Sequence, residues 1–179
     1  VKSGRCSENC KYCVQSSCSD VPVKKQELFS SDEILKKAKL RNRQGICHYG
    51  IVASGRRLSD SEVDRLCESI RKIRQENGIA VCVSGGLLEE RHFRQLKKAG
   101  AARIHNNLET SRTYFSNICT SHTYEDKITT IRAAKRAGLE VCSGGIIGIG
   151  ETMEDRIDMA FALRELEMRS VPVNLLHPV

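Results

Sequence analysis

Residues 138–150 read GLEVCSGGIIGIG, and this run decides the fold class. A segment with helical periodicity ends at Gly138, a short apolar stretch with a cysteine follows, and a further helical segment begins at Glu151. Glycine is the usual residue just beyond the end of a helix. A short apolar strand between two helices is typical of a parallel sheet with both faces covered.

The same alternation runs through the rest of the chain. The sequence predicts helices over 30–42, 58–78, 87–100, 121–138 and 151–168, and strands over 1–4, 44–54, 78–86, 101–107, 138–150 and 170–176. The helix over 58–78 places its apolar residues on one face: Val63, Leu66, Cys67, Ile70 and Ile73. Each strand–helix pair spans roughly 25 to 35 residues, about the size of a right-handed βαβ unit.

An open doubly wound sheet and a barrel both fit this rhythm. Nearly every predicted strand ends in polar or cysteine residues, as expected when strand ends converge on one site at the carboxyl face of a barrel. Six strands, in a chain shorter than the roughly 250 residues of a full barrel, indicate about three quarters of one. We therefore expect an α/β fold, a partial (βα)6 TIM-type barrel formed by one domain over residues 1–179, with exposed edge strands.

Composition excludes several classes of protein. The chain has 179 residues, 40% hydrophobic and 28% charged, as in ordinary soluble domains. No apolar run approaches the roughly eighteen residues of a membrane helix. The net charge is +7, but four Phe, four Tyr and no Trp give no basic stripe interleaved with aromatics, so we expect no nucleic-acid partner. The chain starts with Val and stops in mid-pattern at LLHPV, which suggests a fragment of a longer protein.

Three of the nine cysteines are closely spaced in CSENCKYC, residues 6–13. Long periodic helices separate the other cysteines, which argues for a reducing compartment over a disulfide framework. A structural zinc site needs four ligands, and no second closely spaced pair follows Cys18. Three thiolates can hold an iron–sulfur cubane and leave its fourth iron free for another molecule. The spacing of Cys6, Cys10 and Cys13 favours this third alternative.

CSENCKYC, with an aromatic residue before its last cysteine and a first strand before it, resembles the signature of radical S-adenosylmethionine enzymes. Further stretches resemble the biotin synthase family in order and spacing: YCVQS (12–16), GIVASGR (50–56), HNNLETS (105–111), SHTYED (121–126), VCSGGIIGIGET (141–152) and VPVNLL (171–176). The resemblance extends from end to end of the chain and includes no further C-terminal part. It implies a radical SAM core that inserts sulfur into dethiobiotin.

The resemblance also implies roles for individual residues. The 4Fe–4S ligands would be Cys6, Cys10 and Cys13. The residues in contact with S-adenosylmethionine would be Tyr12, Asn107, Glu109, Lys127 and Ile146. Lys127 stands where the family can carry Arg, and supplies charge without a bidentate fork. The dethiobiotin ring would contact Asn107, Asn174 and His105; some relatives have Asn at the last of these positions.

A second, auxiliary 2Fe–2S cluster is part of the resemblance. It implies Cys82 and Cys142 as two of its ligands, and an Arg beyond the end of this chain. Gly50 stands where the family has another cysteine ligand. Cys47 lies three residues earlier, and in a regular strand that odd offset directs its thiol to the opposite face unless a bulge intervenes.

The remaining cysteines have simpler readings. Cys67 and Cys119 are expected to be small buried hydrophobic residues, and Cys18 a solvent-exposed thiol.

Expected partners are dethiobiotin, a flavodoxin- or ferredoxin-type electron donor and, for the full-length protein, a second copy in a homodimer. The expected location is the cytoplasm, or the mitochondrial matrix of a eukaryote, with no membrane partner. Two other functions stay open. Because of Gly50, one is a related radical SAM enzyme without sulfur insertion, and the other is a non-catalytic iron–sulfur or zinc-binding module.

Overall fold

The computed structural model describes residues 1–4, 6–76 and 78–177. Its strands are β1 His48–Val52, β2 Ala80–Ser84, β3 Arg103–His105, β4 Glu140–Cys142, β5 Gly145–Ile147 and β6 Val173–Leu175. Its helices are α1 Ser31–Arg43, α2 Asp60–Glu76, α3 Glu90–Ala99, α4 Phe115–Ile118, α5 Tyr124–Arg136 and α6 Met153–Glu165. Helices and strands alternate along the chain, as the sequence predicts, with the addition of the short α4.

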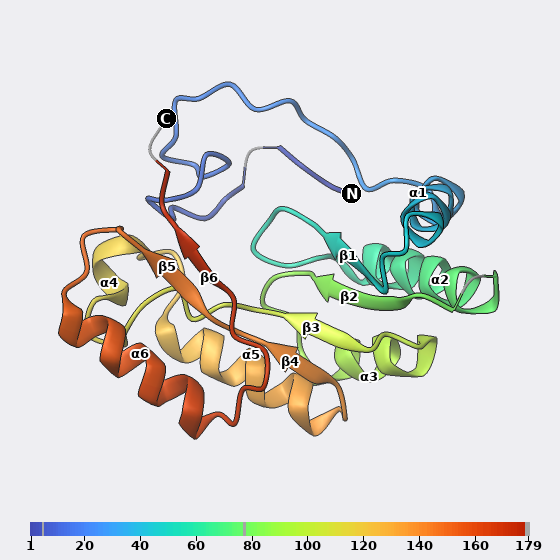
Figure 1. Cartoon of the computed structure of the whole chain (residues 1–179). Coiled ribbons are helices and arrows are strands. Elements are labelled where there is room, and N and C mark those ends of the chain that lie inside the picture. Colours follow the sequence, from blue (N-terminus) through green and yellow to red (C-terminus); the bar gives the residue numbers. More distant parts are fainter. Residues whose placement is uncertain (5, 77, 178–179) are drawn as a thin grey trace.

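All pairs of named strands are parallel and follow chain order. One sheet has the order β1-β2-β3-β4, and β5 pairs with β6 in a second. Isolated parallel bridges, Glu109 with Gly145 and Cys142 with Ser170, connect the two sheets. Another parallel bridge joins Lys2 to Ala53 beside β1. The strands thus form one curved parallel wall with helices on its outer side (Figure 1), which confirms the α/β, partial-barrel prediction.

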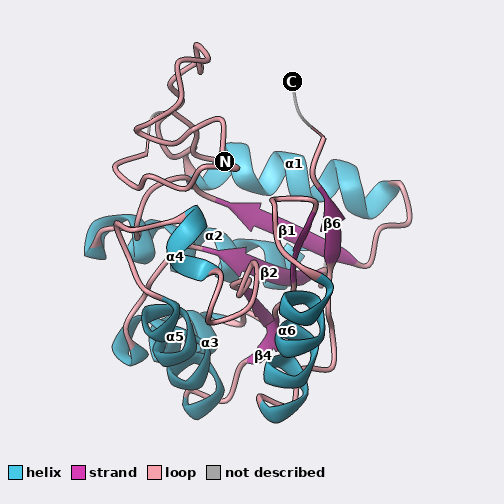
Figure 2. Ribbon diagram, turned by 90° about the vertical axis from the view of Figure 1, so that its left-hand side faces the viewer, coloured by secondary structure: helices cyan, strands magenta, loops and turns pink. Residues whose placement is uncertain are grey.

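Helices pack along one side of this wall (Figure 2), and the buried hydrophobic residues of the core come from both the strands and these helices. On β2, Val81 and Val83 are fully buried toward the helices, whereas Cys82 between them faces the other way and is half-buried. The same alternation on β1 buries Ile51 and leaves Gly50 exposed. All five apolar residues predicted for one face of α2 are buried. One face of each strand therefore builds the core, and the other is available for a site.

Side-chain caps fix where several helices begin. Ser30 caps α1 and accepts a hydrogen bond from the Glu33 N–H, while the Glu33 carboxylate accepts one from the Ser30 N–H. Thr123 and Asp126 form the same reciprocal box at the start of α5. Each box satisfies two backbone donors that helix geometry leaves free. Gly100 ends α3 at φ 103°, a left-handed conformation that glycine adopts without steric cost.

The run 138–150 holds two strands where the sequence predicts one. Gly144 separates β4 from β5, and a Cβ atom there would collide with the carbonyl of Pro172. A Cβ atom on Gly145 would likewise meet the backbone of Glu109. The glycines therefore let neighbouring chain segments approach closely, and the strand breaks where it passes from one sheet to the other. The strand predicted over 1–4 is reduced to single-residue bridges at Lys2 and Ser3.

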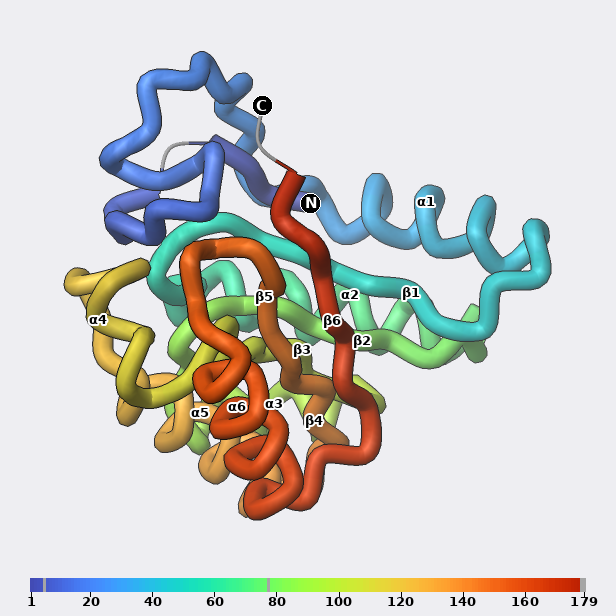
Figure 3. Tube along the Cα trace, turned by 60° about the vertical axis from the view of Figure 1, so that its left-hand side comes forward, coloured from blue at the N-terminus to red at the C-terminus, as the bar shows by residue number. Residues whose placement is uncertain are grey.

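The carboxyl ends of β1, β2 and β3 point toward the segment that carries CSENCKYC (Figure 1). This segment, the loop before α1, lies beside α4 and near the end of β6 (Figure 3). A hydrogen bond of 2.9 Å from the Lys11 N–H to the Ile118 carbonyl connects it to α4. None of the helices among the described residues is long and apolar enough to cross a membrane.

Candidate metal centre

The three closely spaced cysteines lie on one irregular loop, here called the cysteine loop (residues 6–18). The Cys13 N–H donates to the Cys10 carbonyl at 3.1 Å, which closes a turn between two of the thiols. The Cys6 sulfur accepts from the Glu8 N–H at 3.4 Å. Cys10 is buried, and Cys6 and Cys13 are half-buried. The loop therefore presents three thiols at one end of the strands.

A second segment, residues 119–122, forms hydrogen bonds with the cysteine loop. The Asn9 side-chain oxygen accepts hydrogen bonds from the N–H groups of Thr120 at 2.9 Å and Ser121 at 3.0 Å. In return the Asn9 N–H donates to the Ser121 hydroxyl at 3.1 Å. These bonds join residues more than a hundred positions apart, so the cysteine loop is positioned by tertiary contacts.

Glu8 is a buried carboxylate inside the cysteine loop. It accepts hydrogen bonds from the Ser121 hydroxyl at 2.8 Å and from His122 Nδ1 at 2.5 Å, and Arg56 lies at 3.4 Å. Burial alone would raise the pKa of Glu8, but the hydrogen bonds from Ser121 and His122 outweigh it and hold the pKa below its usual range. Glu8 is therefore an anion that connects the cysteine loop to residues 121–122 and to Arg56.

Polar residues from the segment after β3 and from α5 lie beside the cysteine loop. The Tyr12 hydroxyl contacts the Glu109 carboxylate and the Cys10 thiol. Asn107 donates to Glu109 at 3.4 Å and accepts from the Gly144 N–H at 3.0 Å. The positive charge of Lys127 acts on Cys10 and Glu109. The structure thus brings together Tyr12, Asn107, Glu109 and Lys127, four of the five residues predicted to contact S-adenosylmethionine.

Glu109 has two unusual features. Burial raises its pKa despite the opposing charge of Lys127 and the hydrogen bonds from Asn107 and Tyr12. Its backbone adopts φ 75°, an uncommon conformation for a residue with a side chain. Strained backbone and buried charge are often retained at ligand sites. Both features point to Glu109 as a residue that holds a polar ligand.

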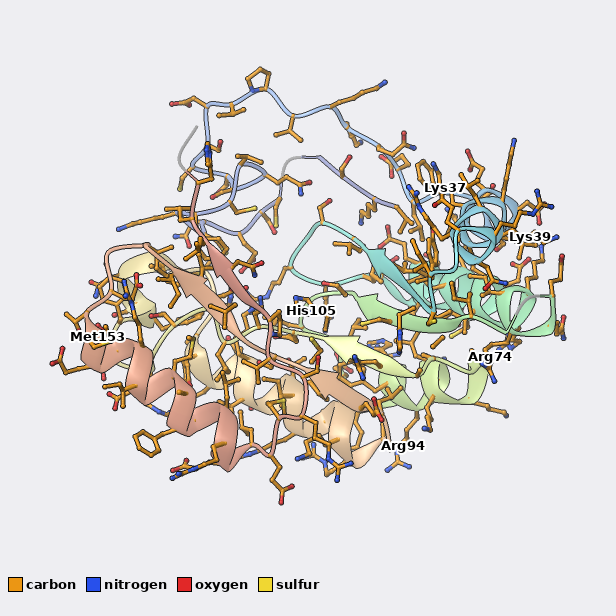
Figure 4. All side chains as sticks on the ribbon, viewed as in Figure 1. Lys37, Lys39, Arg74, Arg94, His105 and Met153 are labelled. Carbon is orange, nitrogen blue, oxygen red and sulfur yellow. The ribbon has the colours of Figure 1, made fainter. Side chains whose placement is uncertain are left out.

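Ile146 and Asn174 lie on the neighbouring pair of strands. They face each other directly in the β5–β6 register, and the Ile146 N–H donates to the Glu109 carbonyl at 2.9 Å. Ile146 therefore adjoins the polar group, whereas the Asn174 side chain is exposed. His105 lies at the centre of the molecule, away from the basic side chains of Lys37, Lys39 and Arg94 on the outer helices (Figure 4).

A pocket of about 380 Å³ opens beside the cysteine loop. Its lining includes Cys10, Tyr12 and Cys13 and, from the end of β6, Leu176 and His177. A cubane takes one thiolate for each of three irons, so its ligands need a shared open space and not one common point. Cys10 and Cys13 line this space and Cys6 lies outside its lining, so three thiols on one loop, two of them facing an open pocket, fit a 4Fe–4S cluster.

The two predicted auxiliary ligands, Cys82 and Cys142, lie on the inner surface of the sheet. This surface is here called the sheet face, and it also carries Gly50, Arg103 and His105. Gly50 pairs in register with Cys82, which pairs with Arg103, and His105 pairs with Cys142. Burial and the nearby Cys142 thiol raise the pKa of Cys82 to about 11, against the opposing charge of Arg103. The two thiols are therefore close enough to interact electrostatically.

Among the residues that the structure describes, none supplies a third thiol at the Gly50 position of the sheet face. A Cβ atom on Gly50 would have no other atom within 4 Å, so nothing fills the position. Cys47 lies before β1, is exposed, and directs its sulfur to the Gly45 carbonyl at 3.7 Å. No bulge brings its thiol to the sheet face. The residues present therefore do not fit a cluster held by three cysteines.

Several residues at the centre were not predicted as functional: Glu8, Asn9, Arg56, Cys119, Ser121 and His122. Cys119 is buried in the hydrophobic core, as predicted, and its sulfur also lies 3.7 Å from the Cys10 sulfur and 3.2 Å from His122 Nδ1. The one available signal was the stretch SHTYED, which contains His122. Cys67 is buried and Cys18 exposed, as predicted.

Comparison with known proteins agrees with this geometry. A family model described as the Radical SAM superfamily matches residues 1–163. Biotin synthases of Clostridium botulinum (strain Loch Maree / Type A3) and Akkermansia muciniphila are each 54% identical to the chain over 178 residues, which is 99% of the chain and 56% of each relative. The chain thus spans little more than half the length of these curated relatives.

Solved structures share the fold at low sequence identity. Methylornithine synthase (PylB) superimposes with a TM-score of 0.83 at 19% identity, over 97% of this chain and 51% of its own. The [FeFe]-hydrogenase maturase HydG gives a TM-score of 0.82 at 21% identity, over 99% and 42% respectively. At such identities the likeness concerns the fold alone.

Proposed function

The chain belongs to the Radical SAM superfamily, and from this membership we propose that it forms the core of an enzyme that converts dethiobiotin to biotin by sulfur insertion. One observation carries the proposal: the 54% identity to biotin synthases extends over 99% of the chain. We take residues 1–179 as one core domain. Because the named relatives are bacterial, we also propose a cytoplasmic location.

Membership in this superfamily implies a 4Fe–4S cluster and S-adenosylmethionine as cofactors. We assign the cluster to Cys6, Cys10 and Cys13. When bound, the cluster would supply the electron that cleaves S-adenosylmethionine into a 5′-deoxyadenosyl radical, which abstracts hydrogen from the substrate. The protein's own part is to keep the three thiols together, and the bonds from Asn9 and Glu8 to residues 120–122 support that role.

The polar group beside the loop would hold S-adenosylmethionine. The Glu109 carboxylate would accept hydrogen bonds from the ribose hydroxyls, and Asn107 would orient that carboxylate. Tyr12 and Ile146 would contact the adenine. Lys127 offers a positive charge for the methionine carboxylate, as a point charge without a fork. Asn107, His105 and Asn174 would contact the dethiobiotin ring, and the register that places Asn174 opposite Ile146 supports a position beside the nucleoside.

The partners of the full-length protein follow from the same proposal. They are dethiobiotin, a flavodoxin- or ferredoxin-type electron donor, and a second copy of the chain in a homodimer.

The proposal is tested on the intact protein, purified without oxygen and supplied with iron and sulfide. We expect a cubane spectrum, formation of 5′-deoxyadenosine and methionine from S-adenosylmethionine, and biotin when dethiobiotin is added. Cys10→Ala should lose the cluster and the cleavage. Cys47→Ala is the matched control, because Cys47 is exposed outside the site. A cluster that assembles fully on Cys10→Ala would contradict the ligand assignment.

Gly50 favours a second candidate, a radical SAM enzyme that does not insert sulfur. The sheet face keeps Cys82 and Cys142 but has no side chain at the third position. If this candidate is right, S-adenosylmethionine is cleaved without formation of biotin, and Cys82→Ser retains all the iron of the wild-type protein. If sulfur insertion is right, Cys82→Ser loses the iron in excess of the cubane.

A further inference from the structure

Cys10 has a second set of potential partners besides the other cysteines of its loop. One ligand atom from each of Cys10, Cys119 and His122 lies within 4.8 Å of the other two, and all three residues are buried. The sulfurs of Cys10 and Cys119 are 3.7 Å apart, and the Cys119 sulfur is 3.8 Å from His122 Nε2. Cys6 and Cys13 do not belong to this group.

These separations suit a single ion. Zinc binds thiolate at about 2.3 Å and imidazole at about 2.0 Å, so two ligands at a tetrahedral angle lie about 3.5 to 3.8 Å apart. Cubane ligands, in contrast, bind separate irons and need no common point. The separations of 3.7 Å between the two sulfurs and 3.8 Å between the Cys119 sulfur and His122 Nε2 match this spacing, and the ligand atoms of Cys10 and His122 lie within 4.8 Å of each other.

Glu8 orients the histidine for this role. His122 Nδ1 faces the Glu8 carboxylate at 2.5 Å, and Ser121 and Arg56 hold that carboxylate in turn. A metal-binding histidine usually donates its other N–H to a carboxylate, which fixes the ring and leaves the second nitrogen free. The Cys119 sulfur lies 3.2 Å from Nδ1 and 3.8 Å from Nε2. When Nδ1 donates its hydrogen to Glu8, Nε2 is the nitrogen whose lone pair can bind an ion.

We propose that the cluster-free protein binds one zinc-type divalent ion through Cys10, Cys119 and His122. Three protein ligands leave a fourth position for water or another small ligand. Two thiolates neutralise the charge of the ion in this buried place. The ion and the cubane exclude each other because both need the Cys10 thiolate; this last point rests on the proposed function, whereas the site itself rests on the geometry alone.

The first test is a titration of the cluster-free protein with Co²⁺, whose thiolate charge-transfer bands report bound sulfur, followed by displacement with Zn²⁺. We expect one equivalent to bind to the wild-type protein and to Cys13→Ser. Cys119→Ser and His122→Gln should weaken binding more than about 100-fold, and Glu8→Gln about 10- to 100-fold. Equal weakening by Cys13→Ser and Cys119→Ser, or no thiolate bands at all, would overturn the proposal.

A second measurement guards against misfolded variants. Zinc should raise the melting temperature of the wild-type protein and of Cys13→Ser, because a ligand that binds only the folded state stabilises it. It should leave the melting temperature of Cys119→Ser unchanged, while that variant melts cooperatively in the absence of zinc. A zinc-dependent rise in Cys119→Ser as large as in the wild type would overturn the site.

Reconstitution with iron and sulfide distinguishes the zinc-type site from the cubane site. With iron and sulfide, Cys119→Ser should form the cubane, and preloaded zinc should inhibit assembly on the wild-type protein but not on this variant. Cys13→Ser should bind Co²⁺ and fail to form the cubane. If Cys13→Ser forms the cubane and still binds Co²⁺, the cubane assignment fails and the new site stands. Inhibition that is equal in the wild type and Cys119→Ser would overturn the shared use of Cys10.

Discussion

The cysteine loop and the sheet face both gather thiols, but by different means. On the loop, the spacing of the residues places three cysteines together, and hydrogen bonds from residues 119–122 hold them. On the sheet face, backbone register places Cys82 and Cys142 near each other, and every further ligand depends on the side chain at one register position. Metal binding by the loop can therefore be lost when its tertiary contacts are removed. Metal binding by the sheet face can be lost through a single substitution, such as that at Gly50.

The largest expected effect distinguishes the thiols of the two regions. Cys13→Ala should abolish the cubane, because it removes one of the three thiolates assigned to the cluster. Cys82→Ala should leave the cubane intact and remove only iron that the sheet face binds. Iron and sulfide counts with Mössbauer spectra of the two variants measure this. Retention of the cubane by Cys13→Ala would remove the distinction between the regions.

The repeating architecture was predictable because it follows from local patterns. Each predicted helix exists, and the apolar face of α2 is buried as its period requires. The division of residues 138–150 into two strands was not predictable, because it depends on close approach of Pro172 and Glu109, which are distant in sequence. Periodicity within a segment contains no information about such contacts.

Some features of the candidate site could likewise be predicted from sequence, and others could not. The cysteine spacing and the polar residues after β3 have sequence signatures, and the structure brings Tyr12 and Glu109 together. For Cys119 and His122 the one signal is the stretch SHTYED, which does not reveal their contacts with the loop, because these depend on how the segment after α4 folds back onto the loop. Cys119 is an ordinary buried cysteine by sequence and becomes a potential ligand only through its position 3.7 Å from Cys10.

The loop that follows β5 is also stabilised by a buried carboxylate, that of Glu151. Glu151 accepts hydrogen bonds from the N–H groups of Gly148 and Ile149 and from Arg156, each at 2.8 Å. Because hydrogen bonds to a charged group contribute about 1.5 to 3 kcal/mol, Glu151→Gln should lower the free energy of unfolding by about 2 kcal/mol at pH 7. Urea denaturation measures the difference.

This effect should depend on pH. Burial alone would raise the pKa of Glu151, but the backbone and Arg156 hydrogen bonds outweigh it and lower the pKa below its usual 4.5. A lowered folded-state pKa gives stability that is complete above pH 4.5 and is lost as the pH falls through the folded-state pKa. The difference between wild type and Glu151→Gln should therefore shrink in acid. A difference that is constant down to pH 3 would show that the charge of Glu151 is not responsible.

The contacts of the cysteine loop should have a smaller effect on stability. Asn9→Ala removes the acceptor for the N–H groups of Thr120 and Ser121, and neutral hydrogen bonds contribute about 0.5 to 1.5 kcal/mol each. We expect a loss of about 1 to 2 kcal/mol and slower cluster assembly. Asn117→Ala, at an exposed position on α4, is the control and should stay within about 0.5 kcal/mol of wild type. Equal assembly rates in both variants would mean that the hydrogen bonds between Asn9 and residues 120–121 do not position the thiols.

The smallest effect on stability is expected at Gly50, where the sheet face can be completed. A glycine inside a strand costs about 0.5 to 1 kcal/mol relative to alanine, and a Cβ atom here meets no other atom within 4 Å. Gly50→Ala and Gly50→Cys should therefore both raise the urea midpoint slightly. The cysteine variant alone places a third thiol in register with Cys82, so it alone should bind more iron than the wild-type protein after reconstitution. If Gly50→Cys and Gly50→Ala bind the same amount of iron, the missing thiol is not what distinguishes the sheet face from the cysteine loop, and the identity of its other side chains, Arg103 and His105, sets what it binds.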